Sequence, residues 1–235
     1  MRCWLAGFLT LVLCGAVRIG RAADKEAERL DNSAEVINEI MGTPDKGIPQ
    51  DLLNKSVCVG IVPSELKGAF MVGASFGRGV LVCRRGGDGP WGAPSLFTVG
   101  GANFGFQIGG QATDFVLLVM NGRGAEKLLQ SKVKLGADAS VAGGPVGRTA
   151  EGATDLQLRS EILTYSRSRG AFAGISLDGQ VVKQDDDANA RLYGRRLEPK
   201  DILFKGTVAV PAAAHALDAA LTQYSPHGGA PFPPK

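Results

Sequence analysis

The middle of this 235-residue chain is a succession of short apolar runs separated by glycines and prolines. Between Ser56 and Gly179 these runs are rich in Val, Ile, Leu and Phe, which predicts β-strands rather than helices. The chain has 33 glycines, about twice the usual share of roughly 7%. Glycines inside strands are typical of bulges, corners and close backbone approach. We therefore expect a strongly bent, mostly antiparallel, barrel-like sheet.

Helices are expected at both ends of this β region. In residues 24–41 the side chains of Leu30, Ala34, Ile37 and Met41 recur at helical spacing, and the opposite face is largely acidic. Short helical turns are expected after Pro49 and around residues 124–130, and C-terminal helices over 185–193 and 211–224. The fold class is thus α+β, with a single domain over residues 24–224 and a disordered, proline-rich tail over 225–235.

The first 23 residues are typical of a secretory signal peptide. Arg2 precedes an apolar stretch, and small residues, Ala22 and Ala23, then offer a cleavage site. The apolar stretch is shorter than the roughly 20 residues that a membrane-spanning helix needs. We expect a periplasmic or secreted protein that can attach peripherally to a membrane. An uncleaved anchor is the alternative.

The net charge belongs to this leader. The whole chain has 26 basic and 23 acidic residues, a formal charge of +3. Arg2, Arg18 and Arg21 lie in the expected signal peptide, which has no acidic residue, so the remainder is balanced. We expect no nucleic-acid partner, and any anion-binding face must arise from local segregation of charge.

Cysteine usage leaves two interpretations open. Without the signal peptide the chain keeps Cys58 and Cys83, each in a strand-like run. In an oxidising compartment they can form a cross-strand disulfide. The alternative is two buried thiols that act as small hydrophobic side chains.

Motifs for catalysis or metal binding are weak. Residues 73–77 match G-x-S-x-G, but more strand follows where a nucleophile elbow needs a helix. The run Asp185, Asp186 and Asp187 is interpreted as a helix N-terminus, because calcium ligands alternate along a loop. There is no phosphate loop and no metal-ligand spacing. We expect a protein that is not an enzyme, with no catalytic residue, metal or cofactor.

The remaining candidates for binding are basic residues at strand spacing. Side chains two residues apart share one face of a strand, and arginine forks suit phosphate oxygens. The alternative is an ordinary solvated face, with arginines paired internally to Asp114, Asp155 or Glu161. The candidate headgroup-binding residues are Lys132, Lys134, Arg84, Arg85, Arg148, Arg167 and Arg169.

Several motifs in order resemble one known family. They are, in chain order, residues 48–53 (IPQDLL), 61–63 (IVP), 77–80 (GRGV), 91–95 (WGAPS), 105–110 (GFQIGG) with Asp114, 142–148 (AGGPVGR), 165–177 (YSRSRGAFAGISL), and Asn189 with 193–194 (YG). Together they resemble the SYLF domain, a lipid-binding module that is also described as actin-binding in yeast actin-patch members. The resemblance covers roughly residues 28–206, and the chain is similar to exported bacterial members.

The resemblance implies a non-enzymatic module that binds phosphoinositides and other acidic phospholipids. It assigns headgroup contact to Arg148, Arg167 and Arg169, and membrane contact to the helix that carries Leu30, Ile37 and Met41. The acidic face of that helix departs from the family pattern. With a signal peptide, actin is an unexpected partner. The alternative function is a structural or protein-interaction module of the cell envelope with no lipid ligand.

Overall fold

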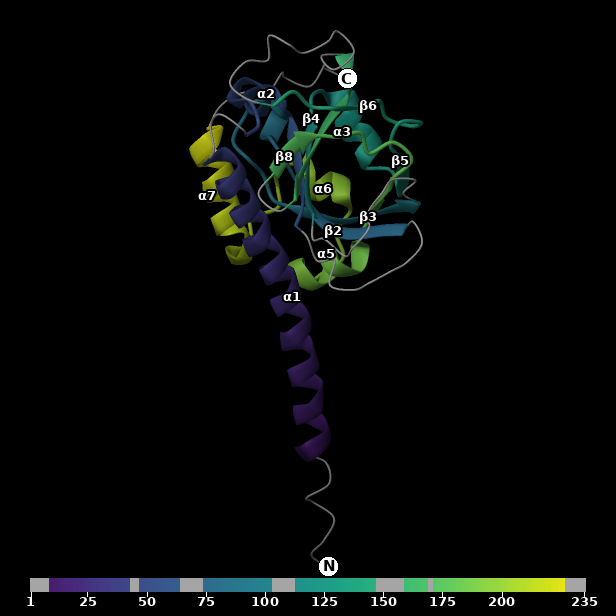
Figure 1. Cartoon of the computed structure of the whole chain (residues 1–235). Helices are drawn as coiled ribbons and strands as arrows, with labels where there is room; N and C mark the ends of the chain where they lie inside the picture. Colours follow the sequence, from purple (N-terminus) through teal and green to yellow (C-terminus); the bar gives the residue numbers. More distant parts are fainter. Residues whose placement is uncertain are drawn as a thin grey trace, which may run out of the picture.

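The computed structural model describes residues 9–42, 47–63, 74–102, 113–146, 159–168 and 171–226. Within these residues one strongly curled sheet carries helices α1 (Leu9–Met41) and α7 (His215–Tyr224) along one side of the body (Figure 1). The predicted α+β class and bent sheet are confirmed.

The sheet has nine strands in the order β5-β9-β3-β2-β1-β4-β7-β6, with β8 also paired to β7. Every pairing is antiparallel except that of β6 with β7. The strands are β1 (Cys58–Val62), β2 (Ala74–Cys83), β3 (Ser95–Ala102), β4 (Thr113–Val119), β5 (Lys132–Lys134), β6 (Val141–Gly143), β7 (Ile162–Ser168), β8 (Ala171–Gly174) and β9 (Val181–Gln184).

The connection between β5 and β6 explains the curl of the sheet. These strands are neighbours in sequence, separated by residues 135–140, yet they lie at opposite ends of the strand order. Eight strands laid flat would span about 34 Å at ~4.8 Å per neighbour. The connecting segment reaches roughly 25 Å when fully extended. The two edges must therefore approach each other, which bends the sheet toward a barrel.

Alternating side chains give the curled sheet two apolar faces. Leu81 and Phe97 point into the inner cluster, whereas Val80 and Leu96 point into the outer cluster that the helices cover. Gly79 permits the curvature at one tight position. A Cβ built there would lie 2.3 Å from the Phe97 ring, closer than any side chain tolerates.

The helices pack on both faces of the sheet: α1 and α7 contribute to the outer cluster, and α3 (Gly122–Leu128) contributes to the inner one. They are α1 (Leu9–Met41), α2 (Gln50–Lys55), α3 (Gly122–Leu128), α5 (Asp186–Tyr193), α6 (Pro199–Leu203) and α7 (His215–Tyr224), with 3-10 turns over Arg85–Gly87 and Ala212–Ala214. Helix α1 begins at Leu9, earlier than the predicted start at residue 24, because nothing between the two apolar stretches breaks the helix. Its first half projects away from the body (Figure 1). Among the described residues, no helix is long and apolar enough to cross a membrane.

Cys58 and Cys83 lie directly opposite each other on β1 and β2. Their sulfur atoms are bonded at 2.08 Å, so the structure has the disulfide rather than two free thiols. Both residues are fully buried. The bond joins the two central strands of the sheet.

Candidate functional site

Lys132 and Lys134 on β5 are exposed, as a binding role requires. Val133 between them is fully buried in the inner cluster. This alternation turns both ammonium groups outward from the curled sheet.

Strand register places further basic residues beside them. Lys132 lies opposite Lys183 of β9, Lys183 lies opposite Thr98 of β3, and Thr98 lies opposite Arg78 of β2. Directly opposite residues project from the same face, so this row crosses four adjacent strands over about 14 Å. We call Lys132, Lys134, Lys183 and Arg78 the basic face.

The basic face has no internal countercharge in the described part of the chain. None of its four side chains forms an ion pair with a described carboxylate. Asp185, two residues beyond Lys183, instead accepts from the Ala188 amide at 3.1 Å and pairs with Arg29. At the other end, Asp138 accepts from the backbone amide of Lys134 at 2.6 Å.

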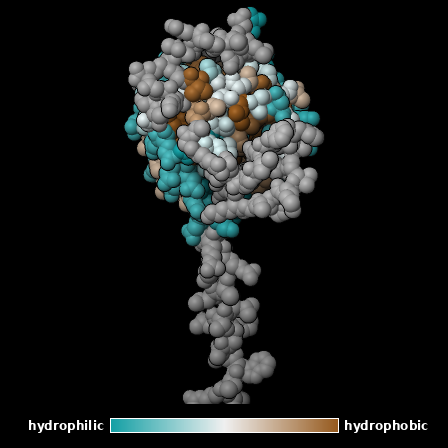
Figure 2. All heavy atoms as spheres, in the orientation of Figure 1, coloured by the Kyte–Doolittle hydropathy of each residue, from teal (hydrophilic) through white to brown (hydrophobic). Residues whose placement is uncertain are grey.

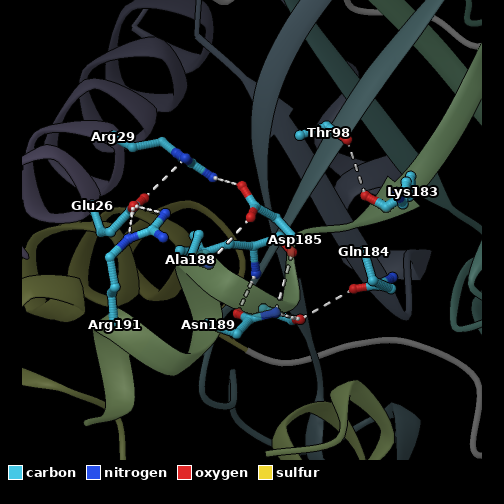
Figure 3. Close-up of polar contacts among 11 residues, drawn as sticks. Glu26, Arg29, Thr98, Lys183, Gln184, Asp185, Ala188, Asn189 and Arg191 are labelled. Carbon is cyan, nitrogen blue, oxygen red and sulfur yellow. Dashed lines mark hydrogen bonds and ion pairs between the residues drawn. The ribbon is translucent and has the colours of Figure 1, made fainter. Parts of the chain in front are cut away.

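Sequence reasoning missed Lys183 and Arg78. Strand β9 has four residues and follows a turn at once, so its alternation is too short to detect. Arg78 lies between two glycines in β2. Figure 3 shows Lys183 beside Thr98, whose hydroxyl donates to the Lys183 carbonyl oxygen at 3.4 Å. Only the register between strands brings these residues to Lys132.

Arg167 is occupied by two carboxylates. Its Nε donates to Asp114 Oδ2 at 2.7 Å, and its guanidinium also pairs with Glu39 at the end of α1. Burial lowers the pKa of Arg167, and its two partners are carboxylates whose charge is opposite to its own. This internal pairing matches the alternative interpretation of the arginines, and it leaves Arg167 poorly placed to bind a phosphate.

Arg84 is buried, and its predicted role at a headgroup is wrong. Its guanidinium donates to the carbonyl oxygens of Ser56, Gly89 and Ser225 at 3.0–3.3 Å. It also stacks 3.9 Å from the centre of the Trp91 ring. Trp91 Nε1 donates to the same Ser225 carbonyl at 3.1 Å. The backbone after α7 therefore encloses this arginine.

The other residues named in the sequence analysis are Arg85, Arg148, Arg169 and the tail that begins at Ser225. Arg85 is exposed but lies past the far end of β2, roughly 20 Å from Arg78 along the chain. Ser225, predicted to begin the disordered tail, is fully buried under Arg84 and Trp91. Arg148, Arg169 and residues 227–235 lie outside the described part of the chain.

The predicted membrane-contact helix is packed inward. Leu30 and Ile37 are both 0% exposed in the outer cluster, and Met41 packs against it partly buried. Helix α7 covers this stripe of α1. The apolar face that periodicity detects is therefore core, and the prediction that it contacts a membrane is wrong for the docked helix.

Buried charges hold α1 in this position (Figure 3). Glu26 lies between two arginines, at 2.9 Å from Arg29 and 2.7 Å from Arg191 of α5. Arg29 also pairs with Asp185 at 3.5 Å. Asp185 caps α5, as the sequence predicts for this aspartate run. The network ties the start of the docked part of α1 to α5.

No group of three His, Cys, Asp or Glu side chains suited to a metal ion occurs among the described residues. In the space-filling view, apolar surface shows at the centre of the body, and hydrophilic surface covers the side of α1 and α7 (Figure 2). The basic face is therefore the strongest arrangement for binding that the described residues offer.

Comparison with known proteins shows the family. The family model described as "Ysc84: Las17-binding protein actin regulator" matches residues 100–224, more than half of the chain. This chain belongs to the Ysc84 family. The SYLF resemblance drawn from the motifs is thereby confirmed.

Curated relatives of this family align with most of the chain. SH3 domain-containing YSC84-like protein 1 of Rattus norvegicus is 34% identical over 204 residues, which cover 86% of this chain and 58% of that protein. Protein YSC84 of Saccharomyces cerevisiae is 34% identical over 200 residues, 84% of this chain and 42% of that protein. The chain thus spans about half the length of the curated relatives it matches.

Proposed function

We propose that this protein binds membranes rich in anionic phospholipid through the basic face, as a peripheral protein outside the cytoplasm. The observation that carries the proposal is the direct opposition of Lys132 and Lys183, with Lys134 beside them and no described carboxylate partner. Like charges directly opposite on a sheet are destabilising. A layer of phosphates relieves that repulsion without any change of fold.

The expected strength is that of a reversible surface contact. Each Lys or Arg near an anionic leaflet contributes about 1 kcal/mol, and the attraction decays within a Debye length. Four such side chains on one face give attachment that salt reverses. The family description names a regulator and no catalytic activity, which supports a binding role.

Co-sedimentation with vesicles tests the proposal. The double variant K132Q/K183Q should bind vesicles of mixed phosphatidylcholine and phosphatidylglycerol about 30-fold more weakly, since two contacts of about 1 kcal/mol are lost. The matched control K55Q/K200Q removes the same charge from exposed lysines elsewhere. It should change binding less than about twofold.

Three results would contradict the proposal. One is failure of the unsubstituted protein to bind either neutral or anionic vesicles. Another is equal binding to both compositions, since the attraction is electrostatic. An equal loss in both double variants would show that total charge, not the basic face, governs binding.

A protein-interaction module is the second candidate. The internal pairing of Arg167 with Asp114 and Glu39 favours it, because it removes one motif arginine from ligand contact. A photo-crosslinking residue in place of Thr98 discriminates the two, since Thr98 lies within the basic face. Crosslinks to lipid support the first function, and crosslinks to protein support the second.

A further inference from the structure

Two large apolar side chains are well exposed among the described residues, Phe76 at 57% and Val146 at 38%. Scattered exposed apolar residues are normal and need no function. Phe76 differs from such scattered residues because it projects from the same face of β2 as Arg78.

Register places Phe76 in the same row of residues as Lys134, next to the row that runs from Lys132 to Arg78. Phe76 lies opposite Gly100, Gly100 lies opposite Val181, and Val181 lies opposite Lys134. Phe76 is also two residues before Arg78, so both project from the same face of β2. Because Gly100 has no side chain, the neighbouring strand offers nothing to cover the ring.

An aromatic ring beside Arg78, on the surface that also carries the lysines, suits the boundary between headgroups and acyl chains. Basic side chains keep their charged ends among phosphates while their stems lie against apolar surface. A large apolar side chain at the edge of such a basic surface is free to enter the acyl region, as in interfacial elements that combine charge with aromatic residues. The 57% exposure of Phe76 shows that its insertion needs no rearrangement of the core.

Helix α1 offers no comparable route. Leu30 and Ile37 are fully buried, and their release would separate the buried Glu26 from Arg191 and the buried Arg29 from Asp185. Removing one member of a buried ion pair is strongly destabilising. Insertion through β2 leaves this network intact.

We propose that Phe76 is the membrane-inserting side chain of this protein, and that the sheet docks on the bilayer while α1 stays packed. The inference rests on the proposed function of the basic face and adds the apolar contact to it. The resulting attachment has two components. Salt screens the electrostatic contact of the basic face, but it does not screen the apolar contact of Phe76.

Fluorescence tests the position of the ring. The variant F76W should show a blue shift on anionic vesicles, and brominated acyl chains should quench it more than the unsubstituted protein. Trp91 is buried, so it adds a background that lipid does not reach. The matched control V146W changes the other exposed apolar residue and should show no added quenching.

Binding measurements test the energetic role. F76S should weaken binding to anionic vesicles about tenfold at high salt, the loss expected for removing a partly inserted ring. At low salt the lysines keep most of the protein on the vesicles, so the bound fraction should change little although the fold loss of affinity is similar. F76L keeps an apolar side chain and should restore most of the salt-resistant binding. Unchanged unfolding midpoints for both variants will show that the fold is intact.

The outcomes separate this inference from the proposed function. Sedimentation of F76W with vesicles but no added quenching overturns the insertion and leaves the basic face in place. Quenching of V146W instead assigns insertion to the other apolar position. A lower molecular mass of F76S by sedimentation velocity would mean that Phe76 contacts a second copy. Absence of vesicle binding by the unsubstituted protein overturns both proposals.

Discussion

Arg84 is a buried, structural cation, whereas other basic residues of this protein are exposed. The guanidinium is fully buried, and burial lowers the pKa of Arg84 to about 10, so it stays charged at neutral pH. Its compensation comes from carbonyl oxygens of Ser56, Gly89 and Ser225 and from the Trp91 ring. In the basic face, by contrast, the three lysines are exposed to solvent and Arg78 is partly exposed.

Replacement of Arg84 by lysine should lower the free energy of unfolding by about 2–4 kcal/mol. A single ammonium group cannot serve acceptors placed around a planar fork, and buried carbonyl groups would lose their donors. Urea denaturation measures the change. R85K is the matched control, since Arg85 is the exposed neighbour, and equal stability losses in the two variants would contradict the assigned role.

Glu161 gives the protein a predictable response to acid. Burial alone would raise the pKa of Glu161, but bonds from Lys127 Nζ at 2.7 Å and the Ser140 amide at 2.9 Å outweigh burial and lower it. A carboxylate with a depressed folded pKa stabilises the fold above its unfolded pKa of about 4.3, and this contribution is lost as pH falls through the folded value.

The variant E161Q should therefore lose about 1–2 kcal/mol of stability at pH 7. The difference from the unsubstituted protein should shrink as the pH falls below about 4, because both chains then lack the carboxylate charge. Unfolding free energies across pH 3–7 test this. A difference that is constant with pH would show that the ion pair is not its source.

At the scale of elements, α1 is held by charge at one end and by apolar packing along its length. Glu26 and Arg29 are each about 1% exposed, and they connect α1 to α5 through Arg191 and Asp185. Leu30 and Ile37 then pack into the outer cluster. The helix behaves as part of the core.

The variant E26Q should destabilise the protein by about 3 kcal/mol, because it removes the carboxylate between two arginines. Backbone amide exchange should accelerate in residues 30–41 more than in the sheet. E28Q changes an exposed carboxylate on the same helix and should leave both measurements unchanged. Uniform acceleration across the protein would argue against a local tether.

At the scale of the whole molecule, the disulfide contributes to the stability of the fold. Cys58 and Cys83 join the central strands across a sequence separation of 25. Reduction should lower the free energy of unfolding by about 3 kcal/mol, mainly by freeing the unfolded chain. Thermal unfolding with and without reductant measures this, with C58A/C83A as the reference that reductant should not affect.

Part of the fold was predictable because its signals are local. The glycine-punctuated runs indicate strands, the α1 stripe repeats every turn, and Asp185 caps the helix that begins at the next residue. Each signal depends on residues within one element. They are enough for the α+β class and a bent sheet, and the family motifs follow from the same runs.

The site was only partly predictable because it depends on which strands are neighbours. Lys132 and Lys134 show as a pair in the sequence, but Lys183 and Arg78 join them through register between β5, β9, β3 and β2. Whether an arginine is buried or exposed also depends on residues far away in the sequence. Ser225 lies 141 residues from Arg84 and still supplies its acceptors.

The amino-acid sequence by itself determined the elements, their order and the charge that each carries, since these follow from neighbours along the chain. Tertiary structure decided which of those charges face solvent. Register between neighbouring strands aligns lysines from separate strands on one surface, while the return of the chain after α7 encloses Arg84. The physical reason is that burial and countercharge depend on distances in space, which residues far apart in sequence set together.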